Sequence, residues 1–346
     1  MLEIRLPELN KQEGVCYAVS DDGLELPVVD VTHPAFRLRV SEERQRALVE
    51  RFLEQQRRFA RLPKLLRGLL LRVFMRGSIM AQGRRRAEGG FLDGMTTYLF
   101  KVGAKNLGEY AVPADRRIAA SLPGLSVRLR LADMAELLAD ALAPSLASAP
   151  GSPLHFLNIA GGPGIDSLNA LLVLVERRRE LLSGRRVCIS VLDRDPHGPA
   201  FGARALAALQ QPGAPLADLS IEFRHRPYDW GDVSGLQPAL DAARAAGALT
   251  IASSEGGLFE YGSDQDIVAN LRALASKPGV NLCMVGSVTR NDETIRTLKL
   301  TSTAATRPRG LDAFSTLIAR AGWRVMRSVA RPLSDQVVIE PLARDS

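Results

Sequence analysis

The sequence predicts an α/β fold, with a doubly wound parallel sheet in the C-terminal half and a mostly helical N-terminal part. From residue 154 onward, apolar β-type runs alternate with helical stretches through short connections, which is typical of parallel strands covered by helices on both faces. The first of these strands runs directly into a glycine-rich turn. The last two β-type runs have no helix between them. Because a parallel pair needs a crossover of about a dozen residues, we expect these two strands to be antiparallel neighbours.

The elements of the C-terminal half follow from hydrophobic period and from turn residues. Short apolar runs predict strands at 154–160, 187–193, 219–228, 248–253, 280–287, 324–329 and 336–339. Longer segments with apolar residues at helical spacing predict helices at 165–182, 199–210, 235–246, 264–276 and 310–321.

The N-terminal part is predicted to be mostly helical up to about residue 150. Cap-type residues, prolines and leucine stripes define its elements. These are short strands and turns in 1–40 with a hairpin turn at Asp21-Asp22-Gly23, helices at 42–61, 64–75 and 126–143, and a linker at 144–153. We therefore expect two domains, 1–150 and 151–346.

Composition is that of a globular protein. The 346 residues, 46% of them hydrophobic, supply an ample core. No uncharged run approaches the roughly 18 apolar residues of a membrane span, and the first residues lack a signal-peptide layout. Three cysteines and four histidines are scattered along the chain, so we expect free thiols and no metal site. These features predict a cytoplasmic protein.

The net charge of +7 is concentrated in one segment. From Gln55 to Ala87 there are ten Arg or Lys residues and no Asp or Glu. Such a block attracts RNA, an anionic lipid surface or an acidic substrate. The segment also carries a leucine-rich apolar stripe, so the alternative is the solvated face of an ordinary amphipathic helix. Its only aromatic residues are Phe59 and Phe74, fewer than RNA-stacking surfaces use.

The segment 154–167 is the strongest candidate for a ligand site. An apolar strand is followed by a turn in which Ala160 and three glycines permit close backbone approach, and the cap-type residues Asp166 and Ser167 begin a helix. A strand, a glycine turn and a helix start leave backbone N–H groups facing a polar ligand. This order predicts a nucleotide or nucleoside site, although a glycine turn can also be only a tight connection.

With these motifs in place, residues 154–340 resemble the class I S-adenosylmethionine-dependent methyltransferases. That family has a Rossmann-like fold, a doubly wound seven-stranded sheet that ends in an antiparallel hairpin. Its first motif is an acid, an apolar residue and Gly-x-Gly-x-Gly. The matching positions, which the resemblance assigns to cofactor binding, include Asn158, Ala160, Gly161, Gly162 and Gly164. Asn158 stands where the family has an acid, so an amide oxygen would accept from the methionine ammonium group without charge assistance. Ala160 replaces the first glycine.

The next two strand ends complete the cofactor site that the resemblance implies. Asp193 matches the carboxylate that accepts hydrogen bonds from the two ribose hydroxyls, and its alternative role is a helix cap, which suits Asp195 better. Asp229 would accept from the adenine amino group, with Tyr228 or Trp230 lining the ring. Trp230 could instead belong to the core.

The loop after the fourth strand is expected to face the transferred methyl group, because ligands of open α/β sheets bind beyond the carboxyl ends of the strands. Ser253 and Ser254 are assigned there to the cofactor, and Glu255 to orienting an amine or acting as a base. From the N-terminal part, residues 91–101 are expected to face the pocket, with Tyr98 as the candidate catalytic residue. For Glu255 and Tyr98 the alternative is a structural role. A methyl group on a sulfonium is already activated, so in-line positioning matters more than a base.

The resemblance implies methyl transfer to an O or N atom of a small molecule, and we expect a role in specialised metabolism. Residues 1–150 would be the lid and substrate-specificity domain. The alternatives are an RNA methyltransferase that grips phosphates with residues 55–87, an NAD(P)-dependent oxidoreductase, and a relative that keeps the fold without the cofactor. The sequence lacks the usual base-methylating signatures, and it does not decide between a monomer and a homo-oligomer.

Overall fold

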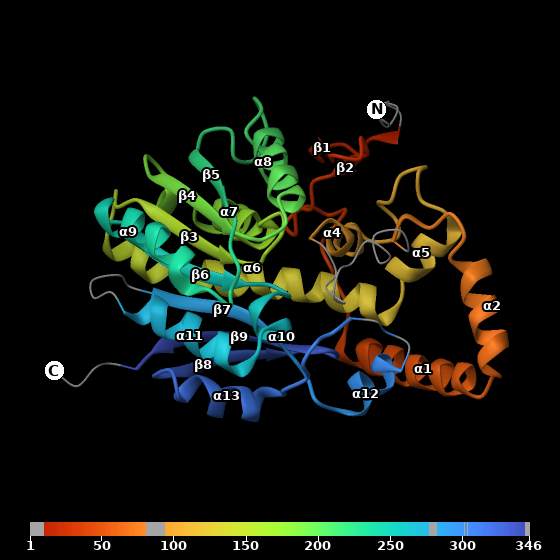
Figure 1. Cartoon of the computed structure of the whole chain (residues 1–346). Helices are drawn as coiled ribbons and strands as arrows, with labels where there is room; N and C mark the ends of the chain where they lie inside the picture. The colour runs from red at the N-terminus through yellow and green to blue at the C-terminus, as the bar shows by residue number, and fades with distance from the viewer. Residues whose placement is uncertain (1–9, 81–93, 277–281, 301, 303, 343–346) are drawn as a thin grey trace.

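The computed structural model describes residues 10–80, 94–276, 282–300, 302 and 304–342 (Figure 1). Its centre is a seven-stranded sheet with the order β5-β4-β3-β6-β7-β9-β8. Strands β3 to β7 run parallel to one another, whereas β9 is antiparallel to both β7 and β8. The predicted fold class is thereby confirmed, including the reversed C-terminal hairpin. The strands are β3 (Leu154–Ile159), β4 (Arg186–Leu192), β5 (Ser220–Arg226), β6 (Leu249–Ser254), β7 (Leu282–Thr289), β8 (Trp323–Ala330) and β9 (Ser334–Pro341).

Helices cover both faces of this sheet (Figure 1). One hydrophobic core joins the sheet to α6 (Leu122–Ser148), α7 (Ile165–Arg178) and α8 (His197–Leu209). A second core joins the other face to α9 (Gln237–Ala245), α10 (Leu258–Tyr261), α11 (Asp264–Ala275) and α13 (Leu311–Ala319). Strand β3 is buried along its whole length because it has a core on each side, which explains its continuous apolar run.

The order of the strands creates a switch point beside β3. The chain leaves β3 to build β4 and β5 on one side, and later returns to build β6 and β7 on the other. In the register, Asn158 near the end of β3 lies between Val191 of β4 and Ser253 of β6. Ligands of doubly wound sheets bind at such a carboxyl-end crevice, so the fold directs attention to the turn after β3.

The N-terminal part shares the core of the sheet. Its elements are β1 (Tyr17–Val19), β2 (Glu25–Pro27), α1 (Glu42–Ala60), α2 (Lys64–Phe74), α4 (Gly94–Val102) and α5 (Pro113–Ala119), with α6 as its last helix. Helix α6 packs against α7 and against strands β6, β7 and β9. The hydrophobic core that includes β3 also includes residues of β1, β2 and α4. The boundary expected near residue 150 therefore separates two stretches of sequence that share one core.

Several local predictions differ from the structure. The linker expected at 144–153 begins too early, because α6 continues through Pro144 to Ser148. Leu142 and Leu146 are both buried, so the apolar face of the helix extends past the proline and holds it in helical conformation. The sequence also predicted no helix at the positions of α4, α5, α10 and α12 (Glu293–Lys299). In the described part of the chain, no helix combines the length and apolar character needed to cross a bilayer.

Candidate functional site

The glycine turn after β3 has a strained and crowded backbone. Ala160 has a φ of +54°, and it is the one non-glycine residue with positive φ in the described ranges. A left-handed conformation costs an alanine about 1–2 kcal/mol. The turn therefore has the backbone geometry of a glycine motif at Ala160 in spite of this cost. At Gly161 an added Cβ would lie 1.7 Å from Oδ1 of Asn158. Only glycine fits at that position.

Asp193 ties the end of β4 to this turn. Its Oδ2 accepts a hydrogen bond from the backbone N–H of Gly162 at 2.8 Å, and its Oδ1 accepts from the N–H of Asp195 at 2.9 Å. Partial burial raises the pKa of the Asp193 carboxyl. Asp195 lies one position before Pro196, the N-cap of α8, and accepts from the N–H of His197, the first residue of the helix. A carboxylate with two oxygens therefore lies beside the glycine turn and has acceptor capacity left for a ligand.

The residues expected around adenine lie farther along the same edge and point in different directions. Tyr228 is buried, and its hydroxyl donates to the side-chain oxygen of Asn270 on α11. Asp229 is exposed and accepts from the N–H of Gly231 at 2.9 Å. Trp230 packs partly against the second core. Of these three residues, Asp229 is the exposed one.

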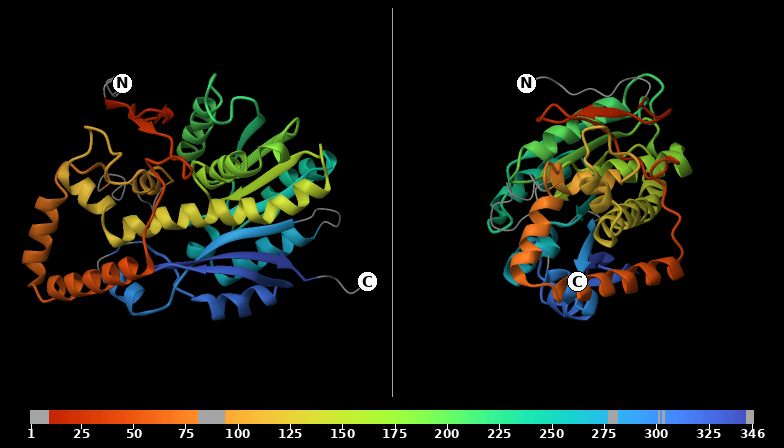
Figure 2. Two further views of the ribbon diagram at one scale, coloured as in Figure 1. Left: turned by 180° about the vertical axis from the view of Figure 1, so that it is seen from behind. Right: turned by 90° about the vertical axis from the view of Figure 1, so that its right-hand side faces the viewer.

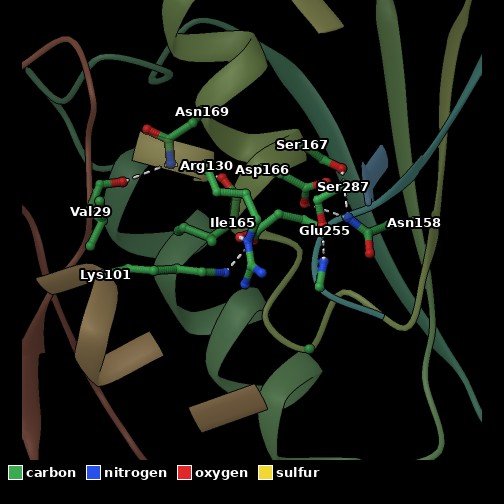
Figure 3. Close-up of polar contacts among 12 residues, drawn as sticks. Val29, Lys101, Arg130, Asn158, Ile165, Asp166, Ser167, Asn169, Glu255 and Ser287 are labelled. Carbon is green, nitrogen blue, oxygen red and sulfur yellow. Dashed lines mark hydrogen bonds and ion pairs between the residues drawn. The ribbon is translucent and has the colours of Figure 1, made fainter. Parts of the chain in front are cut away.

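A cluster of buried polar side chains next to the glycine turn joins β3 to the start of α7 (Figure 3). The side-chain amide of Asn158 donates to Asp166 at 2.5 Å and to the hydroxyl of Ser167 at 3.1 Å. Burial, together with the nearby charge of Glu255, raises the pKa of Asp166. The Oδ1 atom of Asn158 is buried and makes no hydrogen bond of normal geometry, whereas the buried hydroxyl of Ser253 faces the Asp166 carboxylate. An orphaned acceptor such as Asn158 Oδ1 is uncommon in folded interiors and marks a place for a polar ligand.

Glu255, predicted as a catalytic candidate, is enclosed in a buried ion-pair network (Figure 3). One of its oxygens accepts from Lys101 of α4, and the other accepts from Nε of Arg130 of α6 at 2.8 Å. Arg130 also donates to Glu260 at 2.9 Å. Burial alone would raise the pKa of Glu255, but Lys101 and Arg130 hold it below its ordinary value. A carboxylate so paired is a weak proton acceptor.

Tyr98, the other catalytic candidate, is fully buried in the N-terminal part. Its hydroxyl donates to the carbonyl oxygen of Pro27 at 2.7 Å and accepts from the N–H of Val29 at 3.0 Å. Its ring packs against Phe201 of α8, with centroids 4.7 Å apart. In this arrangement Tyr98 fastens the segment after β2 to α4, and its hydroxyl has no free face toward the glycine turn.

Three backbone segments lie directly against the turn. A Cβ on Gly198, in α8, would lie 2.9 Å from Cα of Gly162. A Cβ on Gly94, at the start of α4, would lie 2.8 Å from Cα of Gly162. A Cβ on Gly257, in the loop after β6, would lie 2.6 Å from the carbonyl oxygen of Ala160. Ser254 is buried and accepts from the N–H of Leu258, so it caps α10. The turn is thus enclosed by α4, by α8 and by the loop after β6, and Asp193 is bonded to it from the end of β4.

The structure brings most of the predicted site residues to one edge of the sheet. Asn158, the glycine turn, Asp193, Ser253 and Glu255 lie together, whereas the Tyr98 and Tyr228 hydroxyls are directed elsewhere. Sequence reasoning missed Lys101 and Arg130. Lys101 is the one charge of α4, and a charge within an apolar helix is buried only when it is paired, so its position was a usable signal. Arg130 follows Arg128 and precedes Asp133 in α6, so its position gave no such signal. No cluster of metal-binding side chains occurs within the residues that the structure describes.

Comparisons with known proteins bear on the fold. No protein-family model matches the chain, and no curated protein matches it. Among solved structures it is similar to a possible exported protein from Bordetella parapertussis, with a TM-score of 0.55 and 17% identity over 86% of this chain and 97% of the other. Weaker likenesses include mitomycin 7-O-methyltransferase, with a TM-score of 0.37 and 18% identity over 66% of this chain and 58% of the other. A magnesium protoporphyrin IX methyltransferase from Synechocystis PCC 6803, solved with bound SAH, gives a TM-score of 0.40 and 12% identity over 63% and 87%.

Proposed function

We propose that the chain is an S-adenosylmethionine-dependent methyltransferase that acts on an O or N atom of a small molecule. The observation that carries the proposal is the 2.8 Å hydrogen bond between Gly162 N and Asp193 Oδ2, which joins the turn after the central strand to the acid after its neighbour. The strand order with a reversed β9, and the left-handed Ala160 at a glycine position, support it. Each of these features belongs to the motif layout that the sequence shares with class I methyltransferases.

The residues fit the nucleoside part of this cofactor. Asp193 would hold the ribose hydroxyls, and Asp229 would accept from the adenine amino group. The orphaned Oδ1 of Asn158 offers an acceptor for the ammonium group at the methionine end, and Ser253, whose hydroxyl faces Asp166, lies beside it on β6. The cofactor supplies an activated methyl group, so the chain has to orient the acceptor atom and exclude water. Glu255, held by two cations, would orient Lys101 and Arg130 and would not act as a base.

One observation favours a second function, a nucleoside-binding protein without methyl transfer. Gly94 and Gly257 lie against the turn, and the Lys101–Glu255 pair fills the space beyond β6, where the methionine part and the acceptor would lie. A chain that kept this arrangement would bind adenosine as well as it binds the complete cofactor product.

Calorimetric titration with S-adenosylhomocysteine, adenosine and NAD separates these functions. The methyltransferase predicts that S-adenosylhomocysteine binds more tightly than adenosine and that NAD does not bind. Asp193→Asn should weaken S-adenosylhomocysteine by about 1.5–3 kcal/mol, roughly ten- to hundredfold, because a charged acceptor is lost. Asp195→Asn is the matched control and should bind normally. Equal affinities for adenosine and S-adenosylhomocysteine would support the second function, and unchanged binding in Asp193→Asn would remove the ribose assignment.

A further inference from the structure

Helix α2 exposes an apolar stripe. Leu65, Leu69 and Val73 are spaced by four residues, so they follow one side of the helix. Their exposed fractions are 91%, 60% and 67%. One of the two interpretations of this segment was an ordinary amphipathic helix, which would turn its leucines to a core and its basic residues to solvent. The structure instead leaves these three apolar side chains in solvent, which is costly unless something covers them.

The charges around this stripe are all positive. From Gln55 to Met80 the sequence has seven Arg or Lys residues and no Asp or Glu. Arg57 and Arg58 are paired with Glu293 and Glu54. Arg61 and Arg76, at the two ends of α2, are exposed, and neither side chain has an ion-pair partner in the part of the chain that the structure describes. The apolar stripe is therefore flanked by cations that remain available.

Helix α2 stands at the outer edge of the molecule and is held there by α1. In Figure 2 the two helices form an elbow, with α2 on the side of the molecule away from the sheet. Helix α1 is anchored by the buried ring of Phe52 and by contacts with α6 and α12. The stripe is consequently presented on a fixed support, at a distance from the glycine turn.

We propose that α2 docks on an anionic lipid surface. A basic amphipathic helix of this kind lies in the membrane interface, with its apolar side chains among the acyl chains and its cations at the headgroups. A second copy that used the same face would bring like charges together, because a two-fold interface pairs a patch with itself. RNA would use the charges and leave the leucines uncovered. RNA-binding surfaces stack bases on aromatic side chains, and Phe74 is the one aromatic residue of α2. The Cζ atom of Arg117 lies 5.9 Å from the centre of the Phe74 ring. The proposal is independent of the methyltransferase function.

Vesicle co-sedimentation of the full chain tests this inference. The vesicles are phosphatidylcholine alone and a 3:1 mixture of phosphatidylcholine and phosphatidylserine. We expect binding to the mixed vesicles that weakens with salt, and little binding to phosphatidylcholine. Leu65→Ser/Leu69→Ser/Val73→Ser and Arg61→Glu/Arg76→Glu should each lower the partition coefficient at least tenfold.

Two matched variants control for general surface effects. Met326→Ser removes an apolar side chain that is 51% exposed on β8, and Arg244→Glu reverses an exposed charge on α9. Both should bind mixed vesicles as the unaltered chain does. Because all substituted side chains are exposed, thermal midpoints should be unchanged, which separates lost binding from lost folding. Equal binding to both vesicle types, or unchanged binding of the triple serine variant, would overturn the proposal. So would a dimer in size-exclusion chromatography that the triple variant dissociates, or RNA binding that the arginine variant alone abolishes.

Discussion

Asp193 follows strand β4 and Glu255 follows strand β6, on the two sides of β3. The surroundings of these two acids are opposite. Asp193 accepts from two backbone N–H groups and, among the residues that the structure describes, has no ion-pair partner. Glu255 is bonded to two cations and is fully enclosed. Burial raises the pKa of Asp193, whereas the two cations lower that of Glu255. The comparison shows that position at a strand end brings an acid to the ligand edge, and that its partners decide whether it remains available to a ligand.

The largest expected effect tests whether Glu255 is structural. Lys101→Met removes one cation and leaves part of a buried carboxylate uncompensated, so the free energy of unfolding should fall by about 3–5 kcal/mol. Urea denaturation at pH 7 measures this change. Arg327→Met, which breaks an exposed pair with Asp140, is the control and should cost less than about 1 kcal/mol. A loss below 1 kcal/mol for Lys101→Met would mean that water reaches Glu255, and the catalytic assignment would regain support.

The next effect concerns Tyr98. Tyr98→Phe leaves the carbonyl oxygen of Pro27 and the N–H of Val29 without partners in a buried site, so we expect a loss of about 1–3 kcal/mol in unfolding free energy. Tyr17→Phe, which removes one bond at the surface from the N–H of Gln12, should have a smaller effect. Unchanged stability with abolished methyl transfer would instead assign Tyr98 to catalysis.

The sheet could be read from the sequence because its signals are local. Buried strands such as β3 are continuous apolar runs, and the absence of a helix between β8 and β9 fixed their antiparallel direction. The limits of prediction were also local. Helix α10 has four residues and gives no periodic signal, and Pro144 suggested an end that the buried Leu146 overrides.

The closure of the site could not be read in the same way. Lys101, Arg130 and Glu255 come from α4, α6 and the loop after β6, and only tertiary packing brings them together. The sequence placed Glu255 correctly beyond a strand end. It did not indicate that two cations from the N-terminal part meet it there. The same holds for Gly94, whose contact with Gly162 depends on how α4 packs on the turn.

A smaller effect tests the backbone strain at Ala160, in the turn to which Asp193 is bonded. Ala160→Gly relieves a left-handed alanine, so the unfolding free energy should rise by about 0.5–1 kcal/mol. Gly164→Ala is the opposite control. It has a φ of +62°, and its added Cβ would lie 2.9 Å from Val191, so it should destabilise by more than 1 kcal/mol. Denaturation of both variants in parallel checks the pair. A loss of stability in Ala160→Gly would mean that packing of the alanine methyl group outweighs the strain.

The smallest effect is a difference in pH dependence between the two acids. Because the folded-state pKa of Asp193 is raised above its ordinary 3.8, the stability of the unaltered chain relative to Asp193→Asn should decline as pH rises above about that value. Because the pKa of Glu255 is lowered below its ordinary 4.5, stability relative to Glu255→Gln should instead be lost as pH falls below about that value. Urea denaturation between about pH 3.5 and 6 gives both slopes. Two slopes of the same sign would contradict the comparison, because they would place the two carboxylates in equivalent surroundings.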